Sequence, residues 1–205
     1  MPAPGRGQYD RRQSREARIV EQRARLLSAT AFACSREASP TIASVVKIAG
    51  VSRNTFYEYF DDLAHARTAA AQRAQQQLAR RLHAAEERTR TPVERLRALM
   101  LAWTAWATAA PADAALCLQG APAGLGLAAR ELEAALVRST ATLRASGVQA
   151  PEQEGLRVTV LAAGAEVLAR RLLALGARTS DGTPPRLEVE RAERSLADAA
   201  VRLLR

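Results

Sequence analysis

The 205-residue sequence predicts an all-α protein of about nine helices. Three observations carry this prediction. Apolar residues recur at spacings of three and four along most of the chain, which is the period of an amphipathic helix. The alternation of apolar and polar residues that marks a half-buried strand is not evident in any segment. Prolines, glycines and capping residues fall between the periodic segments, where helices begin and end.

A basic arm and one amphipathic helix are expected first. Residues 1–14 are rich in Pro, Gly and Arg and predict a flexible arm. After them, Ile19, Leu26 and Ala33 fall on one face of a helix, which Ser39 and Pro40 end.

Two short helices follow, each with a suitable cap. Thr41 is a good N-cap for a helix over residues 42–49. Gly50 can adopt the left-handed conformation that ends this helix. Ser52 then caps a third helix, whose inner face carries Phe56, Tyr59 and Phe60.

Six longer or more apolar helices are expected beyond residue 61. Aspartates cap the first of them, and prolines stand in the first turns of two others, where a missing N–H costs nothing. Glycines and a Gly-Thr-Pro-Pro stretch separate the last ones. The expected ranges are 63–90, a helix opened by Pro92, and 113–118, 125–146, 151–175 and 187–204.

The composition excludes several classes of protein. With 48% apolar and 25% charged residues, the chain is not expected to be disordered. Cys34 and Cys117 are too few for a disulfide scaffold, residues 1–15 lack the apolar stretch of a secretory signal, and we expect a cytoplasmic protein. Residues 98–129 are poor in charge, but Pro111 and Gly120 divide them into pieces shorter than the roughly 20 residues that span a bilayer.

Positive charge gathers near the N-terminus. Residues 1–60 carry ten Lys and Arg against five acidic residues, whereas the remaining chain carries 20 against 16. A basic head on a nearly balanced body suggests a polyanion partner, although general enrichment in arginine would give the same excess.

The second and third helices predict a helix-turn-helix. Val46, Gly50 and Phe56 are spaced to hold two helices at a steep angle around a tight turn. The second helix then stands clear of the body and can enter a DNA major groove. Arg53 and Asn54 on its outer face can form bidentate hydrogen bonds with guanine and adenine.

Other polar residues of this region complete the predicted DNA contacts, with hydroxyl and basic groups directed at phosphates. They are Thr41, Lys47, Ser52, Thr55, Tyr57 and Glu58, together with Arg11 and Arg12 of the arm.

Residues 41–60 read TIASVVKIAGVSRNTFYEYF and resemble the DNA-binding domain of the TetR family of bacterial transcriptional regulators. The resemblance extends over about residues 18–70. It implies a homodimer with a DNA-binding head, here residues 15–62, and a ligand-binding and dimerisation body, residues 63–205. Typical members repress a promoter until a small effector binds.

Three positions depart from the family pattern. Arg36 stands near the usual glycine of the turn after the first helix, and Val46 replaces a preferred alanine. Leu63 stands where many members carry a phosphate-binding lysine. These departures concern phosphate contacts and the helix angle rather than the overall assignment.

The resemblance also implies where an effector binds. Met100, Trp103 and Trp106 lie three apart on one helix, and Cys117 lies on the next. Two tryptophans in an aromatic-poor chain favour an apolar or aromatic effector. The alternative is that all four are ordinary core residues. Glu166, inside an apolar helix, could bind a cationic effector, pair with an arginine across an interface or face water.

The last two helices predict the dimer interface, with a palindromic operator as the DNA partner. Their apolar stripes repeat at helical spacing, and small residues allow close approach. The residues concerned are Leu161, Gly164, Leu168, Leu172, Leu175, Val189, Ala192, Leu196, Ala199 or Ala200, and Leu203. The alternative is that both stripes pack inward without dimerisation.

Two other classes of function stay open. An all-α enzyme would need partnered catalytic groups, but His65 and His83 have none in sequence, so no catalytic residue, metal or cofactor is predicted. A DNA-binding protein without effector control, architectural or orphan, is the second, and equal affinity for random and specific duplexes would favour it.

Overall fold

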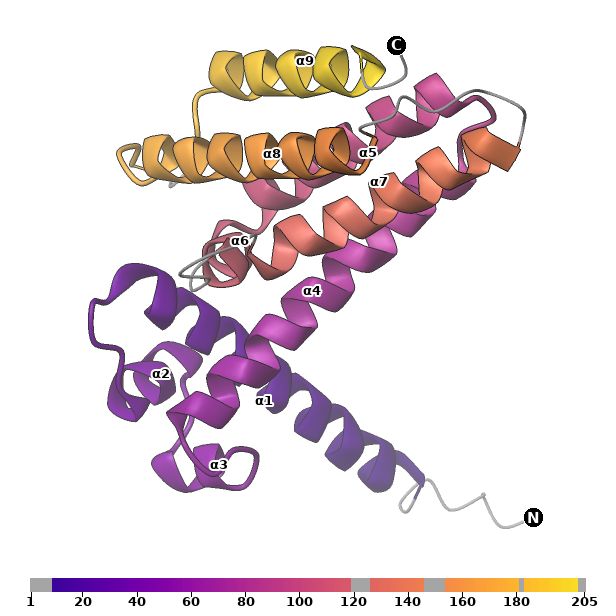
Figure 1. Ribbon diagram of the computed structural model, residues 1–205. Coiled ribbons are helices and arrows are strands. Elements are labelled where there is room, and N and C mark those ends of the chain that lie inside the picture. The colour runs from indigo at the N-terminus through magenta and orange to yellow at the C-terminus, as the bar shows by residue number, and fades with distance from the viewer. Residues whose placement is uncertain (1–8, 119–125, 146–153, 181–182, 203–205) are drawn as a thin grey trace, which may run out of the picture. The chain divides into compact units, whose positions relative to one another are not determined.

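The computed structural model describes residues 9–118, 126–145, 154–180 and 183–202 (Figure 1). The described residues form nine α-helices and no strand, which confirms the predicted fold class. The helices are α1 (Tyr9–Arg36), α2 (Ile42–Ala49), α3 (Arg53–Tyr57), α4 (Leu63–Glu87), α5 (Pro92–Ala109), α6 (Pro111–Leu118), α7 (Leu127–Ala145), α8 (Glu154–Gly176) and α9 (Arg186–Arg202).

The chain divides into two compact units, Met1–Ala70 and Ala71–Arg205, called here the head and the body. The boundary falls inside the continuous helix α4, about two turns beyond the predicted division at residue 62. The first turns of α4 cluster with the head, where Ala66 and Ala70 are fully buried.

Helix α1 is longer than predicted. It begins at Tyr9, so residues 9–14 of the expected arm are helical, and residues 1–8 lie outside the described part of the chain. No glycine lies between Gly7 and the end of this helix, and the segment after Gly7 contains good helix formers. Asp10 lies near the positive end of the helix dipole. Arg11 and Arg12 therefore belong to α1.

The core of the head is small and partly aromatic. Leu26, Val45, Phe56 and Phe60 are buried, and the centroids of the two phenylalanine rings are 5.6 Å apart. Ile19 was expected on the buried face of α1 but is exposed. The first described residue of this helix that is buried is Leu26, so the N-terminal half of α1 does not pack against the core of the head.

The body surrounds a larger apolar core. Side chains from α4 through α9 contribute to it, and both tryptophans are among its largest members. In Figure 1, α8 and α9 lie side by side. None of the described helices is long and apolar enough to cross a membrane.

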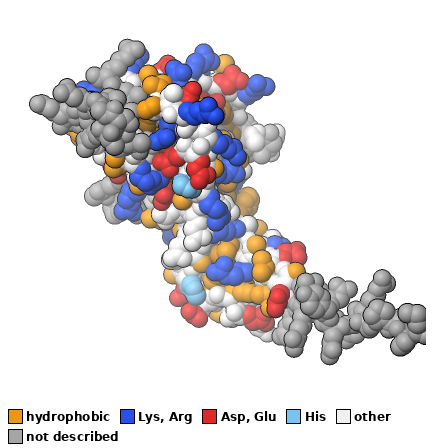
Figure 2. Space-filling model, turned by 90° about the vertical axis from the view of Figure 1, so that its right-hand side faces the viewer, with side chains coloured by type: hydrophobic (Ala, Val, Ile, Leu, Met, Phe, Trp, Pro, Cys, Tyr) orange, Lys and Arg blue, Asp and Glu red, His pale blue; other side chains and the backbone are white. Residues whose placement is uncertain are grey.

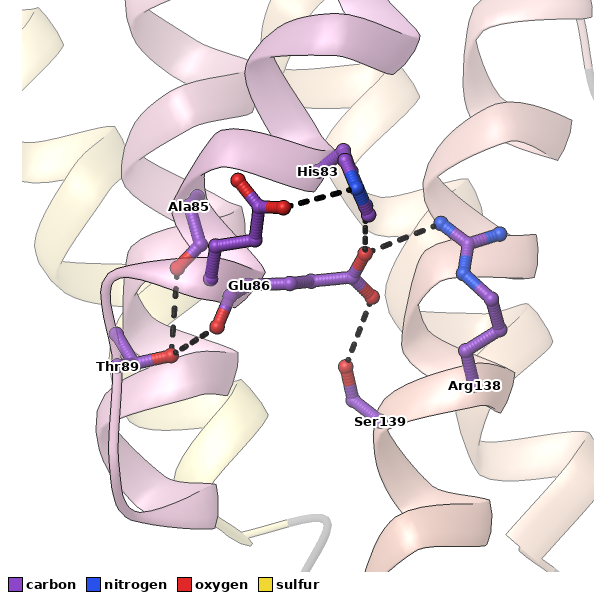
Figure 3. A network of polar contacts seen from close by, with 7 residues as sticks. His83, Ala85, Glu86, Thr89, Arg138 and Ser139 are labelled. Atoms are coloured by element: carbon purple, nitrogen blue, oxygen red, sulfur yellow. Dashed lines mark hydrogen bonds and ion pairs between the residues drawn. The ribbon is translucent and has the colours of Figure 1, made fainter.

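Helix α4 ends at Glu87, about one turn before the expected residue 90. The Thr89 hydroxyl lies 3.3 Å from the Ala85 carbonyl oxygen and 3.0 Å from that of Glu86, so it caps the last turn (Figure 3). Thr91 then forms a capping box with Glu94 that starts α5. The chain therefore turns sharply between the two helices.

Charge of both signs covers the surface. On the face shown in Figure 2, Lys and Arg side chains are interspersed with Asp and Glu. Most of the ion pairs formed by described residues join neighbouring turns or adjacent helices, for example Arg73 with Asp113 and Arg186 with Glu190.

Candidate nucleic-acid interface and effector region

Local hydrogen bonds and one glycine fix the two ends of α2. The Ser44 amide donates to the Thr41 hydroxyl and the Thr41 amide to the Ser44 hydroxyl, both at 3.1 Å. Gly50 ends α2 with φ 64° and ψ 40°, a conformation that strains residues with a side chain. The capping and turn residues therefore act as predicted.

Helix α3 has only five residues and depends on its caps and its core contacts. The Thr55 amide donates to the Ser52 hydroxyl at 3.0 Å, which satisfies one of the free amides of the first turn. Phe56 and Phe60 are buried beneath the helix. With these two rings fixed, the opposite face of α3 is presented to solvent.

Most of the predicted DNA-contacting residues lie on this exposed surface. Arg53, Asn54, Tyr57 and Glu58 of the α3 region are exposed, as are Thr41, Lys47 and Ser52, whereas Thr55 is half-buried. These residues are therefore accessible to a ligand, and whether they contact DNA stays a prediction. The side chains of Arg11 and Arg12 lie outside the described part of the chain, and their contact with DNA stays a prediction.

Arg53 and Tyr57 contact each other along α3. The guanidinium carbon of Arg53 lies 5.9 Å from the centroid of the Tyr57 ring, and Nη2 lies 3.5 Å from the phenol oxygen. Stacking of this kind restricts the rotamers of a long side chain. Arg53 is therefore partly ordered before it meets any ligand.

Three predicted contacts have a structural role as well. The hydroxyls of Ser52 and Thr55 are 2.9 Å apart and bind each other, and the Thr41 hydroxyl caps α2. These hydroxyl oxygens are engaged within the protein, so Arg53, Asn54 and Lys47 are the better candidates for direct contact with DNA.

One polar pair beside α3 was missed by sequence reasoning. The His65 ring nitrogen Nδ1 lies 3.1 Å from the Asp61 carboxylate, and the ring packs edge-on against Phe60 with centroids 5.5 Å apart. The i, i+4 spacing of an acid and a histidine at a helix start was the available signal. This pair supports the position of Phe60 beneath α3.

The residues predicted to bind an effector lie in a closed core. Met100, Trp106 and Cys117 expose no surface, and Trp103 exposes 1%. The two indole rings are 5.7 Å apart. Side chains without accessible surface line no cavity of the size of a water molecule, so an effector could reach them only if the core opened.

The two tryptophans differ in hydrogen bonding. Trp103 Nε1 donates to the Ala165 carbonyl at 3.4 Å, whereas the buried Trp106 Nε1 has no partner among the described residues. An unpaired buried donor costs about 1–3 kcal/mol.

Burial raises the pKa of the Cys117 thiol to about 12, and its sulfur lies 3.7 Å from the Ala71 carbonyl oxygen.

Glu166 holds the ends of two helices together. Its side chain accepts a hydrogen bond of 2.9 Å from the amide of Gly126, just before α7, and pairs with Arg170 at 2.6 Å. Arg170 also donates to the Leu118 carbonyl at the end of α6. Glu166 is therefore paired with an arginine of its own helix, rather than with one across an interface as expected, and it does not simply face water.

Gly126 leaves room for this arrangement. A Cβ at that position would lie 3.0 Å from the Cys117 carbonyl oxygen and 3.4 Å from the Glu166 carboxylate. The carboxylate thus lies at the N-terminus of α7, where the helix dipole favours negative charge.

An open apolar groove lies on α8 and α9. Its volume is about 700 Å³, and Leu156, Val160, Gly164 and Ala199 are among its lining residues. Leu156 is 61% exposed and Val160 62%. Of the residues predicted for the dimer interface, Leu161, Leu172 and Leu196 are buried within the chain, whereas Gly164 and Ala199 are exposed. Leu156 and Val160 were not predicted, and they add uncovered apolar side chains to the groove.

No protein-family model and no curated protein matches the sequence. Solved structures do match. The chain is similar to the fatty acid degradation regulator FadR from Bacillus halodurans, with a TM-score of 0.63, 13% identity, and 85% of this chain and 97% of that chain covered. The fold is that of TetR-family transcriptional regulators.

Two further structures have this TetR fold. One is a gamma-butyrolactone receptor described as ArpA-like, with a TM-score of 0.58, 20% identity, and 91% and 98% of the two chains covered. The other is a TetR-family regulator from Streptomyces coelicolor, with a TM-score of 0.56, 21% identity, and 92% and 88% covered. The TetR fold thus extends well beyond the residues that carry the sequence resemblance.

Proposed function

We propose that the chain is a dimeric, sequence-specific DNA-binding regulator of transcription, and that it represses until a small effector binds. The observation that carries this proposal is the exposed face of α3, with Arg53 and Asn54 held above the buried Phe56. Arginine and asparagine can make the bidentate contacts that distinguish guanine and adenine.

A helix of five residues is long enough for this task because only its outer face reads the bases. α2 crosses the DNA backbone, where Lys47 supplies a phosphate contact, while α3 enters the major groove. Two heads related by two-fold symmetry read half-sites about 34–36 Å apart, or a multiple of that spacing, which requires a palindromic operator.

The groove on α8 and α9 supports dimerisation of the body. Exposed Leu156 and Val160 stand beside small residues, so a second copy could approach closely and cover them. An isologous interface of two helices from each protomer is the simplest closed arrangement.

Helix α4 is the proposed route from effector to DNA. Within the body it is joined to α6 by the 2.8 Å ion pair of Arg73 with Asp113, and to α7 by the contact of Gln75 with Glu131 at 3.3 Å. A shift of α6 would therefore be felt by α4, which continues into the head. We propose an apolar or aromatic effector whose acceptor group binds Trp106 Nε1, which has no partner in the described part of the chain.

Selection of binding sites from genomic DNA tests the main proposal. We expect one enriched palindrome and a two-fold symmetric footprint. Arg53→Ala should weaken binding to that palindrome and leave binding to random DNA nearly unchanged. Equal affinity for random and selected duplexes would instead support the second candidate, a non-specific architectural binder, which the basic N-terminal charge favours.

Sedimentation at micromolar concentration tests the dimer. Val160→Arg should give a monomer, because it places a charge in the proposed interface. Val137→Arg on α7 is the matched control, since Val137 is also an exposed valine of the body. A monomeric unmodified chain would contradict the proposal.

A titration of tryptophan fluorescence with apolar compounds, with and without operator, tests effector control. Linkage requires the operator to weaken effector binding by the same factor, about 5- to 150-fold, as the effector weakens operator binding. Asp113→Asn should preserve effector binding but reduce this factor. A ligand that binds equally in both conditions would show that the two sites are not coupled.

A further inference from the structure

A second hollow of the body lies between α4 and α5 and differs in character from the apolar groove. Its volume is about 550 Å³. Arg80 and Arg81 of α4 line it together with Gln77, and so does Arg88, in the turn that follows the helix. The wall contributed by α5 consists of Ala102 and Ala105.

The hollow is lined by small residues of both helices. Four alanines, two from each helix, line it and leave space that their methyl groups do not fill. The arginines extend beyond these methyl groups and are exposed. The result is a groove with apolar alanines on both sides and arginines along its α4 side.

The positive charge of this groove is not neutralised by its neighbours. Glu86 is directed to α7, where the Ser139 hydroxyl lies 3.3 Å and an Arg138 nitrogen 3.4 Å from its carboxylate (Figure 3). Glu87 contacts His83 at 3.2 Å, and Glu94 accepts the Thr91 amide at 3.1 Å.

No acidic residue lines the groove, and Arg80, Arg81 and Arg88 form no ion pair with any residue that the structure describes. On the face shown in Figure 2 acidic and basic groups are interspersed, whereas the lining of this groove carries basic groups alone. A concave site with one sign of charge concentrates counter-ions of the opposite sign.

The arginines are arranged for more than one anionic group. Arg80 and Arg81 are consecutive residues of α4, whereas Arg88 lies just beyond its last residue, Glu87, about 10 Å further along the axis. This separation allows the two ends of the groove to hold two different anionic groups. Guanidinium groups bind phosphate and carboxylate oxygens through paired hydrogen bonds.

We propose that the groove between α4 and α5 binds a small polyanion that carries at least two phosphate or carboxylate groups separated along its length. A volume of about 550 Å³ matches the size of ordinary small-molecule sites rather than an extended macromolecular surface. The site lies entirely in the body, so it stands independently of the proposed DNA interface and of the closed tryptophan core.

The test is isothermal titration calorimetry of the full chain, without DNA, with inorganic tripolyphosphate and with citrate. We expect saturable binding of at least one of them. The variant with Arg80→Gln, Arg81→Gln and Arg88→Gln should bind that probe more weakly by about tenfold or more, since each lost guanidinium removes a charge-assisted contact.

A matched variant with Arg130→Gln, Arg178→Gln and Arg194→Gln removes the same charge from exposed arginines of the body that do not line the groove. It should bind the probe like the unmodified chain. Absence of saturable binding, equal loss in both variants, or no loss in the first would overturn the proposal. Thermal melting of both variants checks that each is folded, and operator binding is measured separately.

Discussion

The head and the body use their most distinctive residues in opposite ways. In the head, the polar residues on the outer side of α3 lie at the surface, and the aromatic residues beneath them make a small core. In the body, the distinctive residues of α5, Trp103 and Trp106, are closed inside a large apolar cluster. In the head, the distinctive residues of the sequence mark a candidate binding site at the surface. In the body, the distinctive residues mark the core.

The difference has a physical cause. A helix of five residues cannot be stable alone, so α3 needs caps and two buried rings. The side chains on its outer face, such as Arg53 and Asn54, are exposed and can meet a ligand. Helix α5 spans 18 residues and packs against several helices, so its large side chains are needed for the core. A binding site in such a helix requires a conformational opening.

The largest expected effect is on the stability of the body. Trp103→Ala should lower the free energy of unfolding by about 3–5 kcal/mol, because it removes a buried indole and leaves a cavity. Chemical denaturation followed by circular dichroism measures this. Tyr57→Ala is the control from the head, and the exposed ring should cost less than about 1 kcal/mol. Similar losses in both variants would remove the contrast between the two regions.

The next effect concerns DNA and not stability. Arg53→Ala and Asn54→Ala should each cost about 1–3 kcal/mol in binding to the selected operator, with unfolding nearly unchanged. Fluorescence anisotropy with operator and random duplexes separates base reading from general affinity. A uniform loss on both duplexes would assign these side chains to phosphate contacts instead.

Cys117 gives the body a pH dependence of its own. Its pKa is raised in the folded chain, so the unfolded chain loses this proton first as the pH rises. Stability is therefore complete below about pH 9 and falls by about 1.4 kcal/mol for each pH unit above it. Denaturation of the unmodified chain and of Cys117→Ala at pH 8 and pH 10 measures the difference. Identical pH dependence in the two chains would contradict the burial of this thiol.

The smallest effect tests the cap of α3. Ser52→Ala should destabilise the head by about 1 kcal/mol, because the Thr55 amide loses its acceptor. Ser52→Asp, which retains an acceptor, is the matched variant and should be close to the unmodified chain in stability. Hydrogen exchange at the amide of Thr55 would report the loss directly, and unchanged protection would show that the cap contributes nothing.

The amino-acid sequence by itself determined the helices and the outward face of α3. Caps such as Thr41 and Ser52, the left-handed Gly50, and prolines at helix starts act over a few residues, so they can be recognised without the fold. The exposure of Arg53 and Asn54 follows from the same local period once Phe56 is buried. These are short-range constraints, and helical geometry alone is enough to apply them.

Only the tertiary structure decided which neighbours the other residues meet. Glu166 is bound to Gly126 and Arg170 because three helices meet there, and the arginine groove is lined by alanines of both α4 and α5. The tryptophans became core because helices from α4 through α9 surround them. Such outcomes depend on contacts between residues far apart in the chain, and helical periodicity contains no information about which helix lies opposite.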